Sequence, residues 1–130
     1  AHGVSVFEIV RQGKAWCVDQ HGKLNRRITA DTLTYMTGPA AGHRLLQTEA
    51  DLTGNQILGT FNNCSNGKTP WGTYLTCEEN INFNFGSTAA HTQTAEEKRY
   101  GIKGDKSYYQ WEQHDSRFDL SKNPNEANRP

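Results

Sequence analysis

Short runs in which hydrophobic and polar residues alternate are the main structural signal in this chain. Residues 4–10, "VSVFEIV", alternate in this way and are rich in β-branched and aromatic residues, which predicts a strand. The segment "RQGK" follows with Gly13 as a turn former, and "AWCVD" at 15–19 predicts a second strand. The pattern therefore predicts a β-hairpin over residues 3–19.

Further short strands are expected along the rest of the chain, separated by glycine, asparagine and proline turns. They are expected at 26–29, 56–61, 72–77 and 107–113, and "INFNFG" at 81–86 also alternates apolar residues with asparagine. "TYMTGPAAGH" ends an extended piece in a Gly-Pro turn, and "HRLLQTEAD" is either a short helix or a strand or loop. Many short strands with little helix are typical of an all-β sandwich, barrel or propeller. No exact internal repeat decides among these three.

The composition is polar for a chain of 130 residues, the size of one domain. Hydrophobic residues make up 34% of the chain, below the roughly 45–50% apolar usage of globular domains. From Thr88 to Pro130 there is no strong apolar run, so a thin core is expected. Two explanations are open: the C-terminal third is disordered, or the chain is a piece of a larger protein that supplies the rest of the core.

Charge and hydropathy exclude two classes of partner. Lys plus Arg and Asp plus Glu both number 14, and no basic block stands out, which argues against nucleic-acid binding. No apolar stretch approaches the roughly 20 residues of a membrane span. The first residues, "AHGVSV", have no initiator Met and no signal-peptide pattern, so an export signal has been removed or was never present.

Residues 62–80, "NNCSNGKTPWGTYLTCEEN", gather cysteine, glutamate and turn-forming residues in one segment. Because Gly67 and Pro70 break regular structure, "NNCSNGKTPWG" at 62–72 is expected to be a loop, with Cys64 in it at the end of a strand. Glu78 and Glu79 end the following strand, where adjacent side chains point to opposite faces. That strand runs away from the loop, so the sequence leaves open whether Cys64 lies near the two glutamates.

The donor types in this segment are compatible with metal binding. A thiolate suits soft or borderline metals, and carboxylates suit iron and calcium. The three cysteines form no C-x-x-C spacing, which argues against zinc, and their odd number leaves at least one without a disulfide partner. Structural alternatives remain: Cys64 as a small buried hydrophobe, a Cys64–Cys77 disulfide, and a solvated glutamate pair.

Six segments, in this order, resemble the PhoX-type alkaline phosphatase family: "HGVSVFEI", "NRRITADT", "TGPAAGH", "LGTFNNCSNGKTPWGTYLTCEEN", "RYGI" and "DSRFDLSKNPNEANRP". The resemblance runs from His2 to Pro130, and the motif at 58–80 is the most specific part of it. Members of this family are much longer, so residues 1–130 are expected to be a partial β-propeller segment of a larger phosphatase domain.

The resemblance implies a function and a set of ligands. It implies a phosphomonoesterase with an iron and calcium cofactor, acting in the periplasm or after secretion, usually following twin-arginine export. It implies that Cys64 binds iron and that a glutamate of "TCEEN" binds metal, with Glu79 favoured over Glu78. The expected partners are a phosphate monoester and the remainder of the parent chain or packed copies of this segment. With clustered cations at the site, no serine nucleophile is required, so Ser65 is expected to be a loop residue.

Other polar and aromatic residues of the matching motifs are expected to be structural. His2 and His43 match the family pattern, but a hydrogen-bonded structural role is favoured for each. Arg26 and Arg27 form a pair that is able to bind phosphate, yet a polar strand face is the favoured interpretation. Trp71 and Tyr74 are expected in the core or in a pocket wall.

Two further functions compete with the phosphatase interpretation. The first is a non-catalytic, calcium-binding propeller section that acts as a structural or interaction module. The second is a calcium-dependent lactonase on a propeller, which gives no reason for Cys64. Iron together with calcium in the intact protein would favour the phosphatase, and calcium alone would favour the structural module.

Overall fold

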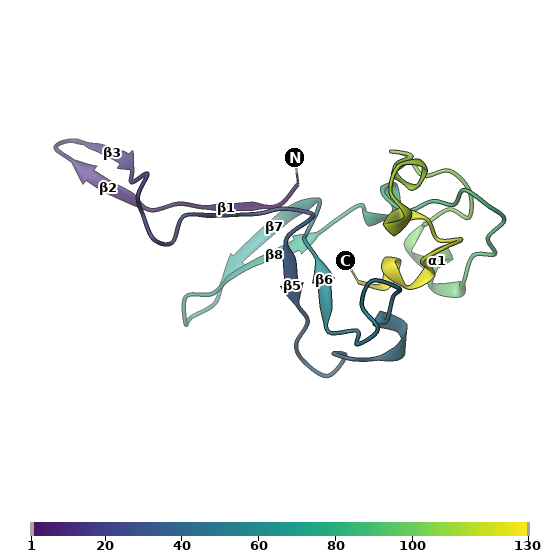
Figure 1. Ribbon diagram of the computed structural model, residues 1–130. Coiled ribbons are helices and arrows are strands. Elements are labelled where there is room, and N and C mark those ends of the chain that lie inside the picture. Colours follow the sequence, from purple (N-terminus) through teal and green to yellow (C-terminus); the bar gives the residue numbers. More distant parts are fainter. Residues whose placement is uncertain (1, 130) are drawn as a thin grey trace.

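The computed structural model describes residues 2–129 and consists mostly of short antiparallel strands (Figure 1). The strands form four separate two-stranded ribbons: β1 (Val4–Val6) with β4 (Arg26–Ile28), β2 (Ile9–Gln12) with β3 (Ala15–Val18), β5 (Leu33–Tyr35) with β6 (Gln56–Leu58), and β7 (Asn63–Lys68) with β8 (Tyr74–Glu78). The prediction of many short antiparallel strands with little helix is therefore confirmed. Each ribbon has two strands, whereas a propeller blade has four, so the propeller stays a prediction.

The N-terminal strand prediction is wrong in one respect. Residues 4–10 form two strands instead of one, because β1 pairs with β4 while β2 pairs with β3. The chain changes partner at Glu8, whose backbone N–H donates to Asn25 Oδ1 at 2.7 Å. The predicted hairpin is thus confined to β2 and β3.

Helical structure is short and lies mainly in the C-terminal half. The one α-helix among residues 2–129, α1 (Ala95–Tyr100), was not predicted. Thr94 caps its first turn in a reciprocal capping box with Glu97, and Gly101 ends it with φ of 72°. The described part of the chain also contains five 3-10 helices: η1 (Arg44–Leu46), η2 (Ile81–Phe83), η3 (Trp111–Gln113), η4 (Ser116–Phe118) and η5 (Pro124–Asn128).

The helices correct two predictions and bear on one open choice. The strand expected at 107–113 is wrong, since Trp111–Gln113 is helical, and the alternating segment at 81–86 begins with η2. In the segment 43–51, where the sequence left helix, strand or loop open, Arg44–Leu46 forms the 3-10 helix η1 and the remainder has no helix or strand. Among residues 2–129, no helix has both the length and the apolar character needed to cross a membrane.

Part of the buried core comes from the segment after Thr88, where the sequence shows no strong apolar run. The core consists of Phe61, Phe85, Ile102, Phe118 and Leu120, each 5% exposed or less. The three phenylalanine rings pack on one another with centroids 5.5 to 6.3 Å apart. The C-terminal third therefore supplies core residues and regular structure, which overturns the explanation by disorder. Gly86 N donates to Phe118 O and Leu120 N to Gly86 O, which joins two distant segments across this core.

Candidate metal centre

The β7–β8 hairpin carries all three residues predicted to bind metal, in an arrangement that the sequence did not predict. Residues 63–68, expected to be a loop, form a strand that pairs with β8. Asn63 lies opposite Glu78 and Asn66 opposite Thr76, so two residues of β7 face one of β8 in a β-bulge. The bulge contains Cys64, and the pairing brings it to the end of β8 that carries the glutamates.

Cys64 and Glu79 lie close together on an exposed face of this hairpin. Glu79 N donates to Asn62 O at 3.0 Å, which extends the strand pairing by one residue beyond β8. Loss of hydration, and then the Glu79 carboxylate, raise the pKa of the Cys64 thiol. Cys64 is exposed and forms no disulfide in the described part of the chain. The structure therefore contradicts both the burial of Cys64 and the Cys64–Cys77 disulfide.

Glu78 lies in a different environment from Glu79. Its Oε1 accepts a hydrogen bond from Phe61 N at 2.9 Å, so it is tied to the backbone that leads into β7. Its Oε2 is buried and has no hydrogen-bond partner among residues 2–129. The two glutamates thus differ in surroundings, as the alternation along a strand predicts.

Asn62 fixes the backbone that leads into β7 two residues before Cys64. It has a left-handed φ of 53°, which asparagine adopts more readily than most residues. Its backbone N–H donates to His2 Nδ1 at 3.0 Å, and its Nδ2 donates to Asn84 Oδ1 at 2.9 Å. Asn84 is fully buried. The sequence signal for this network was weak, because asparagine is counted as a turn former.

The two histidines of the matching motifs have structural contacts. Burial lowers the pKa of His2, and its ring packs edge-on against Phe61 and Trp111. The neutral ring accepts the hydrogen bond from Asn62. His43 caps η1 by accepting from Leu45 N at 3.3 Å. Both residues thus have the structural role that the sequence favoured.

The remaining candidates lie away from Cys64 or at the surface. Arg27 donates to Ser5 Oγ at 2.8 Å and to the His2 carbonyl at 2.9 Å, so it holds the N-terminal ribbon. Ser65 is exposed on β7 instead of in a loop. Trp71 and Tyr74 are exposed, which overturns their prediction as core residues, although Tyr74 lines a cavity between β1–β4 and the β7–β8 hairpin.

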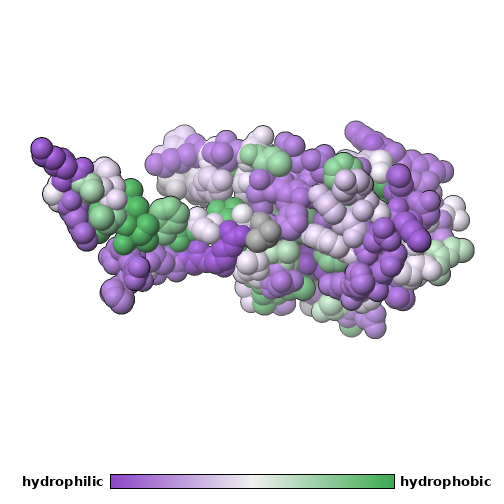
Figure 2. Space-filling view, turned by 90° about the horizontal axis from the view of Figure 1, so that it is seen from above, coloured by the Kyte–Doolittle hydropathy of each residue, from purple (hydrophilic) through white to green (hydrophobic). Residues whose placement is uncertain are grey.

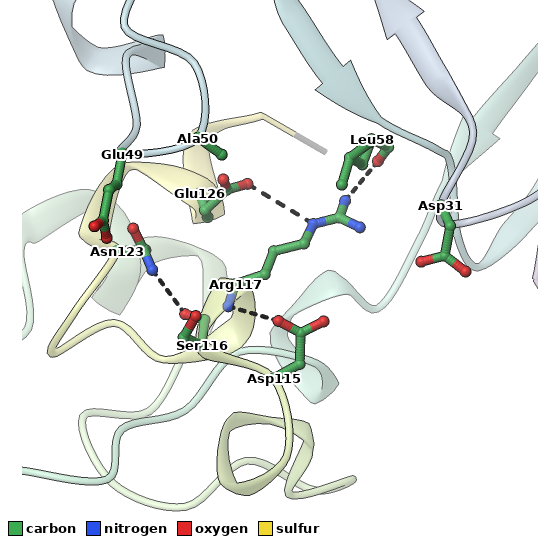
Figure 3. A pocket seen from close by; sticks show the side chains of 9 residues that line it. All are labelled: Asp31, Glu49, Ala50, Leu58, Asp115, Ser116, Arg117, Asn123 and Glu126. Atoms are coloured by element: carbon green, nitrogen blue, oxygen red, sulfur yellow. Dashed lines mark hydrogen bonds and ion pairs between the residues drawn. The ribbon is translucent and has the colours of Figure 1, made fainter.

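A second cavity, of about 500 Å³, surrounds Arg117 and was not predicted (Figure 3). Arg117 donates to the carbonyl oxygens of Ala30 at 2.8 Å and Leu58 at 2.5 Å, and it lies 3.8 Å from the Glu126 carboxylate. Its guanidinium also lies 5.1 Å from the centre of the Phe118 ring, and burial lowers its pKa. The arginine therefore ties the ribbons to the C-terminal helices, and this cavity has a structural explanation.

The donors present fit part of a metal site. A thiol and a carboxylate that are already adjacent suit iron, and a free carboxylate oxygen suits calcium. Within residues 2–129, however, no group of three or more His, Cys, Asp and Glu side chains converges closely enough to hold a metal ion. The candidate centre thus needs further ligands from outside the described residues.

Comparison with known proteins decides the family. The family model described as alkaline phosphatase PhoX matches residues 1–129. The chain belongs to the PhoX alkaline phosphatase family. It is similar to the solved structure "Pseudomonas fluorescens PhoX in complex with vanadate, a transition state analogue", with 50% sequence identity and a TM-score of 0.87. The match covers 98% of this chain and 22% of that PhoX chain. A search of the curated proteins found no match.

Proposed function

We propose that this chain is part of a metal-dependent phosphomonoesterase, and that Cys64 and Glu79 bind iron in its active centre. The observation that carries this proposal is the β7–β8 pairing, which brings the thiol and the carboxylate together on an exposed face. Membership of the PhoX family supports a phosphate monoester as the substrate. The solved relative, whose complex contains a transition state analogue, supports the same class of reaction.

We assign different roles at the proposed centre to Cys64, the two glutamates and Asn62. Cys64 and Glu79 present sulfur and oxygen to iron. Glu78 has one buried oxygen that no donor among residues 2–129 contacts, so we propose it as the candidate ligand for calcium on the other side of the hairpin. The cations, when bound, neutralise the phosphoryl oxygens and lower the pKa of an attacking oxygen. The Asn62 network keeps Cys64 and Glu79 in register, since Asn62 O accepts from Glu79 N.

The remainder of the parent protein is also part of the proposal. Residues 1–130 are proposed as a partial β-propeller segment, since the match covers 22% of the PhoX chain and leaves most of that chain unmatched. The other ligands and the rest of the substrate site would then come from the unmatched part. A periplasmic or secreted location is proposed on family membership alone.

The test is Cys64→Ala in the full-length protein, with Cys17→Ala as the matched control. Cys64→Ala is expected to remove iron and phosphatase activity together, because the thiolate ligand is lost. Cys17 lies on β3, in a separate ribbon, so Cys17→Ala is expected to keep both. Iron and calcium are measured by elemental analysis and activity with a chromogenic phosphate ester. Full activity in Cys64→Ala would refute the assignment, and calcium without iron in the wild type would favour the structural module.

A further inference from the structure

The β2–β3 hairpin extends away from the rest of the chain as an arm, seen at the left of Figure 1. Its base is fixed by polar contacts: Leu24 N donates to Glu8 Oε1 at 2.6 Å, and Asn25 Nδ2 donates to Asp19 O at 2.6 Å. Asp19 N also donates to Glu8 O at 2.9 Å. These bonds set the direction of the arm, so its exposed position is built into the fold.

One face of this arm is apolar and uncovered. The register pairs Ile9 with Val18 and Arg11 with Trp16, which places Ile9, Trp16 and Val18 on the same face, together with Arg11. Ile9 is 52% exposed, Trp16 66% and Val18 53%. Figure 2 shows hydrophobic side chains gathered along the arm. We call these three residues the apolar arm face.

Such a face is not expected to remain in water. An isolated two-stranded hairpin is marginally stable, and a contiguous exposed apolar patch marks an interaction site. Tryptophan in particular is enriched at the centres of interfaces, because it buries a large area with few rotatable bonds. The opposite face carries Val10, Gln12, Ala15 and Cys17, whose side chains are smaller than that of Trp16, and Val10 is only 38% exposed, so the larger exposed apolar side chains are on the face of Trp16.

The unmatched part of the related PhoX chain indicates which segment packs against this face. The match takes in 98% of this chain, so the arm belongs to the shared fold, but it takes in 22% of the PhoX chain. Most of the parent protein is therefore available to pack against the arm. A segment of the same polypeptide is also held at a high effective concentration, which favours it over a second copy.

We propose that the apolar arm face docks onto the part of the parent chain that lies outside these 130 residues, with Trp16 as the anchor. This inference rests on the proposed function only in taking the chain as part of a larger PhoX protein. It assigns the arm a role in joining this segment to the rest of the protein, apart from the metal centre.

The test is site-specific crosslinking in the full-length protein. Trp16 is replaced by the photoreactive p-benzoylphenylalanine, with Gln12, on the opposite face, as the matched control position. Ile9 serves as a second position on the apolar face in case the change at Trp16 prevents folding. The expected result is an intrachain crosslink from positions 16 and 9 to residues outside 1–130, with little from position 12.

Three outcomes would overturn the proposal: crosslinks between two copies, no crosslink from either apolar position, or equal crosslinking from both faces. Thermal unfolding adds a second measurement, in which Trp16→Ala lowers the midpoint and Gln12→Ala leaves it unchanged. Iron and calcium are measured on the same samples. Intrachain crosslinks without iron would refute the proposed metal centre and support the docking inference. Iron without intrachain crosslinks would support the metal centre and refute the docking inference.

Discussion

Replacing Arg117 with methionine is expected to loosen the contact between the ribbons and the C-terminal helices. The substitution Arg117→Met keeps a long apolar side chain but removes the guanidinium. The carbonyl oxygens of Ala30 and Leu58 then lose their donor. Leu58 ends β6 and leads toward Phe61 and β7, and Ala30 packs against the core that contains Phe61, so the change acts on the backbone that leads to Cys64.

The size of the effect follows from the contacts that are lost. A hydrogen bond to a charged group contributes about 1.5–3 kcal/mol, so the two bonds to Ala30 and Leu58 contribute roughly 3–6 kcal/mol. Methionine regains some contact with the Phe61 and Phe118 rings, and Glu126 still has Arg129 at 3.4 Å. We therefore expect a loss of about 3–5 kcal/mol, in line with the cost of breaking a buried ion pair.

Native-state hydrogen exchange in the full-length protein measures this loss. At about 1.4 kcal/mol per factor of ten, exchange of the Gly86 and Leu120 amides, which bond across the core, should quicken by roughly a hundred- to a few-thousand-fold. Arg117→Lys should give a smaller change, because lysine keeps the charge but not the planar fork. Arg99→Met on the exposed end of α1 is the control, with an expected effect within about 0.5 kcal/mol. Equal exchange in Arg117→Met and the control would refute the structural role.

Three further predictions concern the metal centre, acid stability and the isolated segment. Glu79→Gln is expected to lower iron content and activity by at least about 10–100-fold, which is the loss seen when a residue that only hydrogen-bonds a metal ligand is replaced. Glu78→Gln is expected to have the smaller effect. Equal, mild losses in metal analysis would place both glutamates on a solvated edge. A hydrogen bond from Thr53 is the largest cause that lowers the pKa of Asp51 to about 2 from 3.8, so its stabilising contribution is present above about pH 4 and lost as the pH falls toward 2. Asp51→Asn should remove that part of the pH dependence in acid unfolding curves, and an unchanged curve would contradict it. Residues 1–130 expressed alone with iron and calcium should aggregate and fail to hydrolyse a chromogenic ester, and turnover by a monomer would place the whole site within them.

Alternation along the chain predicted those strands whose own residues favour extended structure. β3, β4, β6 and most of β8 lie within predicted strands. The alternation is clear in β3 and β8, whereas β4 and β6 each contain a single β-branched residue, Ile28 and Ile57. β7 was missed because "NCSNGK" has the composition of a turn, and it is extended through pairing with β8. Strand preference depends strongly on cross-strand neighbours, so one strand read alone could not show that Cys64 approaches Glu79.

The C-terminal half was mispredicted because its core contains polar residues. At 107–113 the aromatic run suggested a strand, but the Glu112 carboxylate accepts from Ser107 N at 3.0 Å and Ser107 Oγ at 2.6 Å, which closes a compact turn. The capping box of Thr94 and Glu97 was visible in "TAEE" and could have predicted α1.

Asp119 shows why composition predicted so thin a core. It is fully buried, and burial alone would raise its pKa, but hydrogen bonds from Ser121, Thr88 and Lys122 outweigh that effect and lower it. A hydropathy count treats such a carboxylate as surface, although it occupies interior volume and fixes the turn beside Phe118 and Leu120. The C-terminal half thus folds around a small aromatic core surrounded by hydrogen-bonded carboxylates. The apolar residues of the N-terminal arm have no such cover within residues 2–129. The arm is therefore the part of this chain that most requires the rest of the parent protein for burial.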